Sequence, residues 1–208
     1  MNSTAGLLVI IEGINGAGKT TVINKLSNHY AAVKIPFVVY KFPNRNGIYG
    51  KQIDGYLKGT TVINSKYDII NMFAANRESV RESIIQDIID GKIVICDRYI
   101  YSAIAYHIPN HVINPTTLMA YCSIIGYFDK KMPNPDITYI IDGDHLVKRE
   151  GIVPREKFHY YGLRSMQMFS TLVRVVSLCV NKFMVLKNRL DKCDELVNFI
   201  VNDIEYRR

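Results

Sequence analysis

The sequence predicts an α/β fold in which helices cover both faces of a five-stranded parallel sheet. Three observations predict it: short runs that are apolar at almost every position, longer segments of helical character between them, and glycine or polar turns where the two meet. Strands that are apolar on both faces are typical of a parallel sheet covered on both sides. We expect the 208 residues to form one domain, residues 1–208, with a single core.

The expected strands are marked by their composition and by the residues at their ends. The first run is continuously apolar up to Glu12, and Pro36 precedes the second. The third and fourth runs end at Asp97 and Asp142. Polar residues and turn formers are typical of strand boundaries. The five expected strands are Leu7–Ile11, Phe37–Tyr40, Ile93–Cys96, Ile137–Ile141 and Phe183–Leu186.

The segments between these runs are long enough for helices. The first expected helix begins at Lys19, directly after a glycine-rich loop. Gly91 marks the end of the second, because glycine is favoured just after a helix C-terminus. The expected helices are Lys19–Tyr30, Ser65–Asp90, Pro154–Val180 for most of its length, and Asp194–Ile204.

Composition and charge exclude several classes of protein. The chain is 48% hydrophobic and 22% charged, and none of its apolar runs reaches the length of about 18 residues that indicates a membrane span. The start of the chain also lacks the features of a signal peptide, so we expect a cytoplasmic protein, with the nucleus as the alternative. The formal charge of +7 is spread along the chain, which does not favour a nucleic-acid partner. The four cysteines form no C-x-x-C pair and are expected to be reduced.

A glycine-rich loop follows the first expected strand. Residues 13–20, Gly-Ile-Asn-Gly-Ala-Gly-Lys-Thr, fit the pattern G-x-x-x-x-G-K-[ST] at every fixed position. Glycines let the backbone curl so that successive N–H groups point at phosphates, and the following helix presents its positive end to the same anion. The pattern predicts a three-layer P-loop NTPase fold and an ATP site formed by Gly13, Asn15, Gly16, Ala17, Gly18, Lys19, Thr20 and Thr21.

Two side chains of this loop carry its chemistry. The Lys19 ammonium is expected to reach the β and γ phosphates, and the Thr20 hydroxyl is expected to bind Mg²⁺. GTPases, motor ATPases and small-molecule kinases all use such a loop. The loop therefore predicts binding of a nucleoside triphosphate and leaves the reaction open.

Asp97-Arg98-Tyr99 stands where the third expected strand ends. Ligands of open α/β sheets bind at the carboxyl ends of the strands. A carboxylate placed there can hold a Mg²⁺-bound water, and a guanidinium can clamp a phosphate through two hydrogen bonds. Taken alone, these residues fit a salt bridge at a strand end equally well.

Five motifs occur in a fixed order along the chain. They are the loop segment 12–21; Phe42-Pro43-x-Arg45 followed by Gly50-Lys51 and Tyr56-Leu57; Phe73-Ala-Ala-Asn76-Arg77-Glu78; Asp97-Arg98-Tyr99-x-Tyr101-Ser102-x-x-Ala105-Tyr106; and Pro133-x-Pro135-Asp136. In residues and spacing they resemble the motifs of the thymidylate kinase family, over nearly the whole chain.

The resemblance implies how a pyrimidine nucleotide would be held. Phe73 would stack on the pyrimidine ring, and Arg77 would donate a hydrogen bond to its O4, which cytosine lacks. Tyr106 would stand against the 2′ position of the sugar and disfavour a ribonucleotide. For Phe73 and Tyr106 the alternative is an ordinary core aromatic residue. The implied substrate-binding residues are Asn15, Phe42, Arg45, Phe73, Arg77, Arg98, Ser102 and Tyr106.

The resemblance also assigns residues to the phosphates. Arg45 and Arg98 would grip the monophosphate, and Asp97, together with Thr20, would hold the metal. Many family members have an acidic residue at the position of Asn15, where it contacts the sugar 3′-hydroxyl. Asn15 can form that hydrogen bond but carries no charge.

Gly16 implies a catalytic arginine elsewhere in the chain. Family members with glycine at this position supply the arginine from a lid, and residues 144–157 are the expected lid here. The candidates are Arg149 and Arg155, with Lys148 a weaker one, and the alternative is that they are solvated surface charges. The expected catalytic residues are Lys19, Asp97, Arg98, Arg149 and Arg155.

The sequence thus predicts Mg²⁺-dependent transfer of a phosphoryl group from ATP to dTMP. The enzymatic alternative is a kinase with another or broader acceptor, such as dUMP, other deoxynucleotides or a deoxynucleoside. The alternative from another class is a nucleotide-binding protein with weak or no catalysis. Members of the family pair through long helices, so a homodimer is expected, with residues Ser65–Asp90 as a candidate interface.

Overall fold

The computed structural model describes residues 6–107, 115–143, 183–189 and 191–208. Their centre is a five-stranded sheet in which every pair of neighbouring strands is parallel, in the order β2-β3-β1-β4-β5. The predicted parallel sheet is therefore confirmed. The strands are β1 (Leu7–Glu12), β2 (Phe37–Lys41), β3 (Ile93–Asp97), β4 (Ile137–Asp142) and β5 (Phe183–Lys187).

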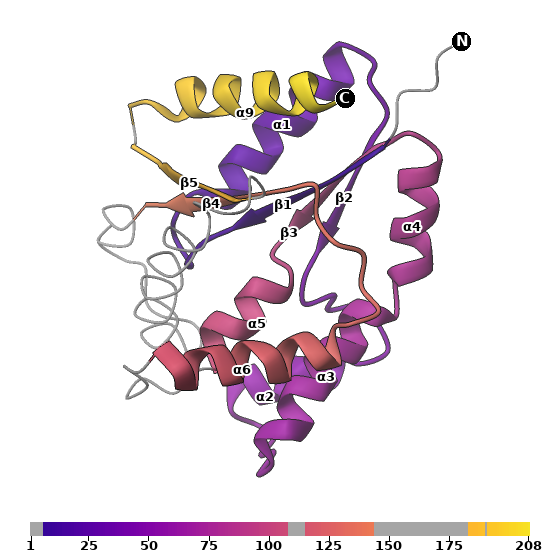
Figure 1. Cartoon of the computed structure of the whole chain (residues 1–208), viewed down its shortest axis with the longest axis vertical. Helices are drawn as coiled ribbons and strands as arrows, with labels where there is room; N and C mark the ends of the chain where they lie inside the picture. The colour runs from indigo at the N-terminus through magenta and orange to yellow at the C-terminus, as the bar shows by residue number, and fades with distance from the viewer. Residues whose placement is uncertain (1–5, 108–114, 144–182, 190) are drawn as a thin grey trace.

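Helices cover both faces of this sheet (Figure 1). In that view α1 and α9 lie on one side of the sheet, α4 lies on the other, and α2, α3, α5 and α6 form a group beside the sheet. None of the described helices is both long and apolar enough to cross a membrane. The described helices are α1 (Lys19–Ala32), α2 (Gly50–Lys58), α3 (Lys66–Glu78), α4 (Arg81–Ile89), α5 (Ile100–His107), α6 (Pro115–Phe128) and α9 (Cys193–Arg207).

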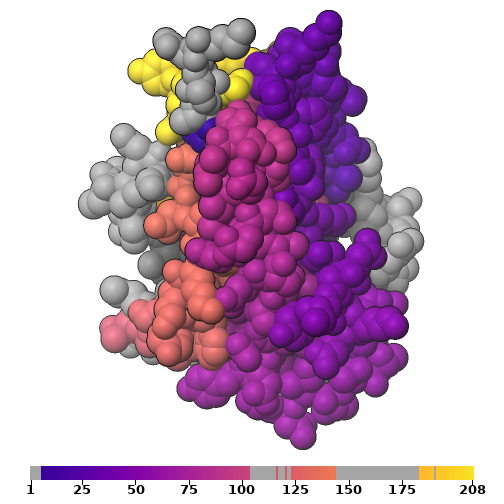
Figure 2. All heavy atoms as spheres, turned by 90° about the vertical axis from the view of Figure 1, so that its right-hand side faces the viewer, coloured from indigo at the N-terminus to yellow at the C-terminus, as the bar shows by residue number. Residues whose placement is uncertain are grey.

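The two faces of β1 belong to two hydrophobic clusters. Leu7, Val9 and Ile11 pack in the cluster that contains the buried residues of α1 and α9. Leu8 and Ile10 pack in a second cluster that contains Ile84 of α4. The alternation arises because successive side chains of a strand point to opposite faces. Figure 2 shows the α4 face, where that helix lies between the segment that leads to β4 (orange) and the earlier part of the chain (indigo to purple).

The expected helix Ser65–Asp90 is two helices in the structure. The Ser65 hydroxyl accepts a hydrogen bond from the Asp68 N–H at 3.2 Å and caps α3, as a helix N-cap does. At the other end, the Ser79 hydroxyl donates to the Asn76 carbonyl at 2.8 Å, and Val80 leaves the helical conformation with φ −116° and ψ 9°. The periodicity of the sequence does not reveal this break, because a side-chain hydrogen bond to a nearby carbonyl group leaves no trace in the hydrophobic pattern.

Three described helices have no counterpart among the expected elements. The helix α2 follows a turn, α5 begins directly after Asp97-Arg98-Tyr99, and α6 begins at Pro115. The expected helix Pro154–Val180 lies outside the described residues, whereas the last expected helix is confirmed as α9.

Candidate active site

The phosphate loop joins β1 to α1 at the carboxyl edge of the sheet. Gly13 has φ 145° and Gly18, the N-cap of α1, has φ 90°. Residues that carry a side chain rarely adopt these φ values, so the turn itself requires glycine at these positions of the motif. A Cβ on Gly13 would lie 2.4 Å from the carbonyl oxygen of Ile141 in β4, which shows how closely the loop passes the neighbouring strand.

Lys19 folds back over the loop. Its Nζ donates hydrogen bonds to the carbonyl oxygens of Gly13 at 2.9 Å and Ile14 at 2.7 Å, and the residue is 7% exposed. Burial is the main reason why the pKa of Lys19 lies well below its ordinary value, and the positive charge of Arg98 lowers this pKa further. A polyphosphate bound in the loop would stabilise both cations, because opposite charges offset the cost of burial.

The ends of β4 and β5 hold the loop from its other side. Asn188 directly follows β5, and its Nδ2 donates to the carbonyl oxygen of Ala17 at 2.9 Å. A Cβ on Gly143, which follows β4, would lie 2.7 Å from the same oxygen. Sequence reasoning named no role for Asn188. The signal that could have found it is its place at the carboxyl end of a parallel strand.

Glu12, the last residue of β1, fastens the loop to α5. Its Oε1 accepts hydrogen bonds from the backbone N–H groups of Tyr99 at 2.8 Å and Ser102 at 2.9 Å, and its Oε2 accepts from the Ser102 hydroxyl at 2.6 Å. Burial raises the pKa of this carboxyl group, although Arg98 and the three hydrogen bonds favour its charged form. Ser102, a predicted substrate-binding residue, is therefore held by an acid to which the sequence assigned no role.

Arg98 reaches from the end of β3 to the phosphate loop. Its backbone has φ 70°, a left-handed value that is uncommon for residues other than glycine. Its Nη1 donates to the carbonyl oxygen of Gly13 at 2.9 Å, and its Nη2 donates to Oδ1 of Asn15. A residue predicted for the acceptor phosphate thus contacts the loop predicted to bind the donor.

Asp97 offers a carboxylate oxygen that suits a divalent cation. The residue is 7% exposed, its Oδ1 is buried without a hydrogen-bond partner among the described residues, and its Oδ2 lies 3.6 Å from Nζ of Lys41. Mg²⁺ is held by one or two carboxylates together with substrate phosphates and water. The described residues contain no cluster of three or more His, Cys, Asp or Glu side chains. Thr20, the second predicted ligand, is exposed near the start of α1.

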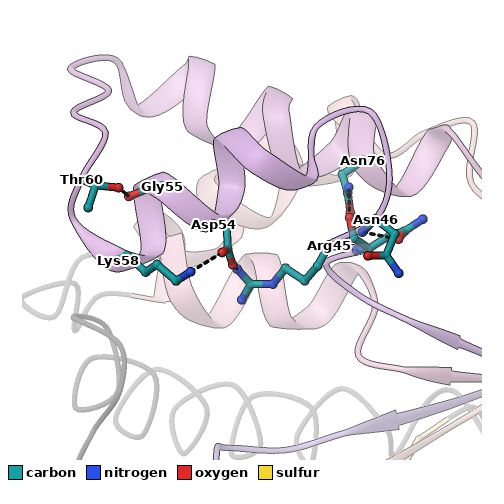
Figure 3. A network of polar contacts seen from close by, with 8 residues as sticks. Arg45, Asn46, Asp54, Gly55, Lys58, Thr60 and Asn76 are labelled. Carbon is teal, nitrogen blue, oxygen red and sulfur yellow. Dashed lines mark hydrogen bonds and ion pairs between the residues drawn. The ribbon is translucent and has the colours of Figure 1, made fainter.

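Arg45 lies on the turn between β2 and α2, where it pairs with Asp54 of α2 (Figure 3). Lys58, one helical turn further along, bonds the other oxygen of the same carboxylate at 2.6 Å. Two cations therefore share one acid, and Arg45, which is about one-third exposed, is open to solvent. An incoming phosphate would compete with Asp54 for the guanidinium.

Asn76 of α3 holds the turn that carries Arg45. Its Oδ1 accepts a hydrogen bond from the Asn44 N–H at 2.8 Å, and its Nδ2 donates to the Asn44 carbonyl oxygen at 2.9 Å (Figure 3). The Asn76 side chain is completely buried. This pair of bonds couples the position of Arg45 to the helix that carries Phe73 and Arg77.

The predicted base-reading residues lie on α3, one helical turn apart. Phe73 is half-buried, and its ring meets that of Tyr56 edge-on with centroids 6.3 Å apart. Arg77 is 3% exposed and forms two hydrogen bonds to Asp129. Phe42 is 4% exposed and packs near Tyr99, so its side chain belongs to the second hydrophobic cluster.

Three predicted residues fall outside this description. Tyr106 belongs to α5, but the placement of its side chain lies outside the described residues. Arg149 and Arg155 lie outside them together with the whole expected lid, residues 144–157. Their roles stay predictions.

Known proteins are similar to this chain in sequence and in fold. A family model described as thymidylate kinase matches residues 11–174. The chain is similar to the thymidylate kinase of Dictyostelium discoideum, with 34% identity over 102 residues, and to that of Desulfotalea psychrophila, with 36% identity over 106 residues. These matches cover 49% and 51% of this chain and 46% and 52% of the relatives, so the chain spans about half the length of the curated relatives it matches.

A solved structure extends the comparison over the whole chain. The thymidylate kinase of Candida albicans superposes with a TM-score of 0.77 at 25% sequence identity, and the match covers 98% of this chain and 92% of that one. The family model covers far more than half of the sequence and includes the phosphate loop, the Arg45 turn, α3 and Asp97-Arg98-Tyr99. The chain therefore belongs to the thymidylate kinase family.

Proposed function

We propose that this protein transfers the γ-phosphoryl group of ATP to dTMP and produces dTDP and ADP. The observation that carries the proposal is the contact of Arg98 with the phosphate loop, at Gly13 and Asn15. A guanidinium in that position can grip an acceptor phosphate beside the donor phosphates. Membership of the thymidylate kinase family supports dTMP as the acceptor.

On the donor side, the loop and Lys19 would hold the triphosphate of ATP. Lys19 would exchange the carbonyl oxygens of Gly13 and Ile14 for phosphate oxygens. The negative charge of the phosphates would then offset the positive charge of the ammonium group. Thr20 and Asp97 would hold Mg²⁺, and the orphaned Oδ1 of Asp97 supports this role. When bound, the metal would neutralise part of the charge on the phosphate groups.

On the acceptor side, Arg45 and Arg98 would orient the monophosphate for in-line attack. A phosphate oxygen is ionised near neutral pH, so the reaction needs no general base, and catalysis rests on positioning and on charge stabilisation. Phe73 and Arg77 would bind the base. The remaining proposed contacts to the nucleotide come from Asn15, Phe42, Ser102 and Tyr106.

Two further features complete the proposal. Arg149 or Arg155, in the expected lid, would stabilise the transferring phosphoryl group, since Gly16 offers no cation in the loop. A homodimer, with residues 65–90 as a candidate interface, is proposed on the resemblance to the family. Sedimentation equilibrium over a range of protein concentrations would measure the mass of the assembly.

A coupled assay of ADP release tests the reaction. Purified protein would be given Mg²⁺, ATP and, in turn, dTMP, dUMP, dCMP, dGMP or thymidine. We expect the highest kcat/KM with dTMP. Equal rates with dTMP and dGMP would favour the broader-acceptor alternative, and a preference for thymidine would indicate a nucleoside kinase. Binding of ATP without consumption in any mixture would contradict the proposed reaction.

A further inference from the structure

Arg77 and Asp129 form a buried ion pair that bridges two elements. Nε of Arg77 donates to Oδ1 of Asp129 at 2.7 Å, and Nη2 donates to Oδ2 at 2.6 Å. The side chains are 3% and 1% exposed. Arg77 belongs to α3, and Asp129 directly follows α6, so the pair connects the helix predicted to bind the base with a segment 52 residues later.

Stability alone is a weak reason for such a pair. Two charges removed from water lose their hydration, and replacing a buried ion pair by apolar residues is often neutral or stabilising. Asp129 also follows the C-terminal end of α6, and its N–H donates to the carbonyl oxygen of Ile125. A carboxylate is unfavourable at that end of a helix dipole. What the pair does provide is a fixed guanidinium, because a bidentate fork defines both the plane and the direction of the group.

The fixed guanidinium keeps donors for a ligand. A guanidinium carries five N–H donors, and the fork with Asp129 uses two of them. Among the residues that the structure describes, no other acceptor takes the rest. A ligand oxygen placed at one of these donors would accept a charge-assisted hydrogen bond of defined direction. Phe73, four residues earlier on the same helix, offers its ring to the same ligand, since residues four apart share a helix face.

The pair also lies near the residues proposed to hold phosphate. Asn76, the neighbour of Arg77 on α3, forms hydrogen bonds with both backbone groups of Asn44. Asn44 directly precedes Arg45, which is proposed to hold the monophosphate. The fork therefore lies on the acceptor side of the candidate site.

We propose that Asp129 is a positioning residue that fixes Arg77 so that the site prefers a pyrimidine with an oxygen at C4 over one with an amino group. The inference rests on the proposed function and adds a determinant of base selectivity to it. Asp129 does not touch the base itself. Its carboxylate holds the guanidinium in the one orientation in which the free N–H groups face an acceptor. An amino group at C4 would face these donors with donors of its own and would be rejected.

The test replaces Asp129 by Asn. The amide oxygen can still accept one hydrogen bond from Arg77, but the amide NH₂ faces a guanidinium N–H, so the fork is lost with little change of volume. We expect the ratio of kcat/KM for dTMP to that for dCMP to fall at least about tenfold, through a higher KM for dTMP, because a small displacement of a binding group has a large effect. The kcat for dTMP and the KM for ATP should change by less than about threefold.

Glu78 provides the matched control. It forms an ion pair with Lys131, between the end of α3 and the same segment after α6, and it is exposed. Glu78→Gln removes a tie between the same two elements without touching Arg77. Its selectivity ratio should equal that of the wild type. A loss as large in Glu78→Gln as in Asp129→Asn would show that the general attachment of α3 matters and would overturn the inference.

A second variant covers the case in which Asp129→Asn does not fold. Asp129→Glu keeps the charge and the ion pair but moves the carboxylate by one methylene, so Arg77 must shift. Selectivity should again fall, and an unchanged ratio in this folded variant would overturn the inference.

A double-mutant cycle gives the decisive comparison. In an Arg77→Ala background, Asp129→Asn should cause no further loss of selectivity, because a residue that acts only through Arg77 has no effect once Arg77 is absent.

The same assay separates this inference from the proposed function. A wild-type protein that phosphorylates no nucleotide would contradict the proposed function. A wild-type protein that prefers dTMP to dCMP, with Asp129→Asn retaining that preference, would contradict only the role of Asp129.

Discussion

Each described cation proposed to hold a phosphate is bonded to an oxygen of the protein. Lys19 donates to two loop carbonyl groups, Arg98 donates to Gly13 and Asn15, and Arg45 pairs with Asp54. Protein oxygens therefore occupy the donors that phosphate oxygens would use. Binding of a nucleotide becomes an exchange of partners, which limits the cost of holding these charges in the free protein.

Lys19→Ala tests the donor half of the site. We expect turnover to fall by about two to three orders of magnitude, because the ammonium would stabilise charge that develops on the transferring group. The measurement is kcat in the ADP-release assay, with melting temperature to verify folding. Lys25, an exposed lysine of the same helix that pairs with Asp194, is the control, and Lys25→Ala should keep wild-type turnover. Near-normal turnover of Lys19→Ala would refute the assignment.

Arg45→Ala tests the acceptor half. Arg45 and Lys58 bond the same carboxylate of Asp54, but only Arg45 is proposed to hold the monophosphate. Arg45→Ala should raise the KM for dTMP by at least about tenfold, as expected for loss of a charge-assisted hydrogen bond, and should leave the KM for ATP unchanged. Lys58→Ala should leave both near wild type. Equal effects of the two substitutions would show that the pairing with Asp54 matters and that Arg45 has no special role.

At the scale of elements, side-chain contacts between segments set the positions of the site residues. Glu12 fastens α5 to the end of β1, Asn76 fastens the Arg45 turn to α3, and Asp129 fastens α3 to the end of α6. Each contact is directional, and those of Glu12 and Asp129 are buried. The elements of the acceptor side therefore move together rather than independently.

Asn76→Ala should loosen the Arg45 turn. It removes two hydrogen bonds to the backbone of Asn44 from a completely buried position, and the free energy of unfolding should fall by about 1–3 kcal/mol. The KM for dTMP should rise as well, because Arg45 loses its fixed position. Urea denaturation and initial rates measure the two effects. Asn46→Ala, at an exposed position of the same turn, should change neither.

The contact between β2 and α4 should make stability depend on pH in acid. Burial raises the pKa of Asp87, but hydrogen bonds from Lys92 and Tyr40 outweigh it, so the pKa lies below its ordinary value of 3.8. A depressed pKa in the folded state means stabilisation that is present above the ordinary value and lost as the pH falls through the folded pKa. The melting temperature of Asp87→Asn should thus be lower than that of the wild type at pH 7. This difference should shrink as the pH falls below 3.8 and vanish below the folded pKa, and a difference that persists there would contradict the assignment.

At the scale of the whole molecule, the topology brings the site together. The order β2-β3-β1-β4-β5 places β1 at the centre, so the phosphate loop lies between the ends of β3 and β4. Asp97 of β3 is paired with Ile11 of β1 on one side and with Lys41 of β2 on the other. The end of the edge strand β2 therefore lies near the phosphate loop, which follows β1. Residues from distant parts of the chain meet at one edge because all carboxyl ends of a parallel sheet lie on the same side.

The expected lid would complete the site, and its arginines can be tested singly. Arg149→Ala and Arg155→Ala should differ, with turnover falling by about two orders of magnitude or more for the arginine that contacts the transferring group. The other substitution should have a small effect. Stopped assays of dTDP formation would measure both. Equal, small losses would mean that both are surface charges.

The sequence predicted the sheet and the donor loop because local signals specify them. Continuous apolar runs require a strand that is buried on both faces, and the motif of residues 13–20 requires a tight turn at its glycines. The five strands were predicted to within a residue or two at each end. The break at Ser79 and Val80 was missed, because a side-chain hydrogen bond to a nearby carbonyl group leaves no trace in the hydrophobic pattern.

The partners of the site residues were beyond the reach of the sequence. Asp129 lies 52 residues from Arg77 and Asp54 lies nine from Arg45, and no spacing rule joins either pair. By itself the sequence determined which residue types form the loop, the sheet and the motifs, because those depend on backbone geometry and on burial along short segments. Only the tertiary structure decided which acid holds which cation, because a charge buried in the fold takes whatever partner the packing of distant elements brings within hydrogen-bond distance.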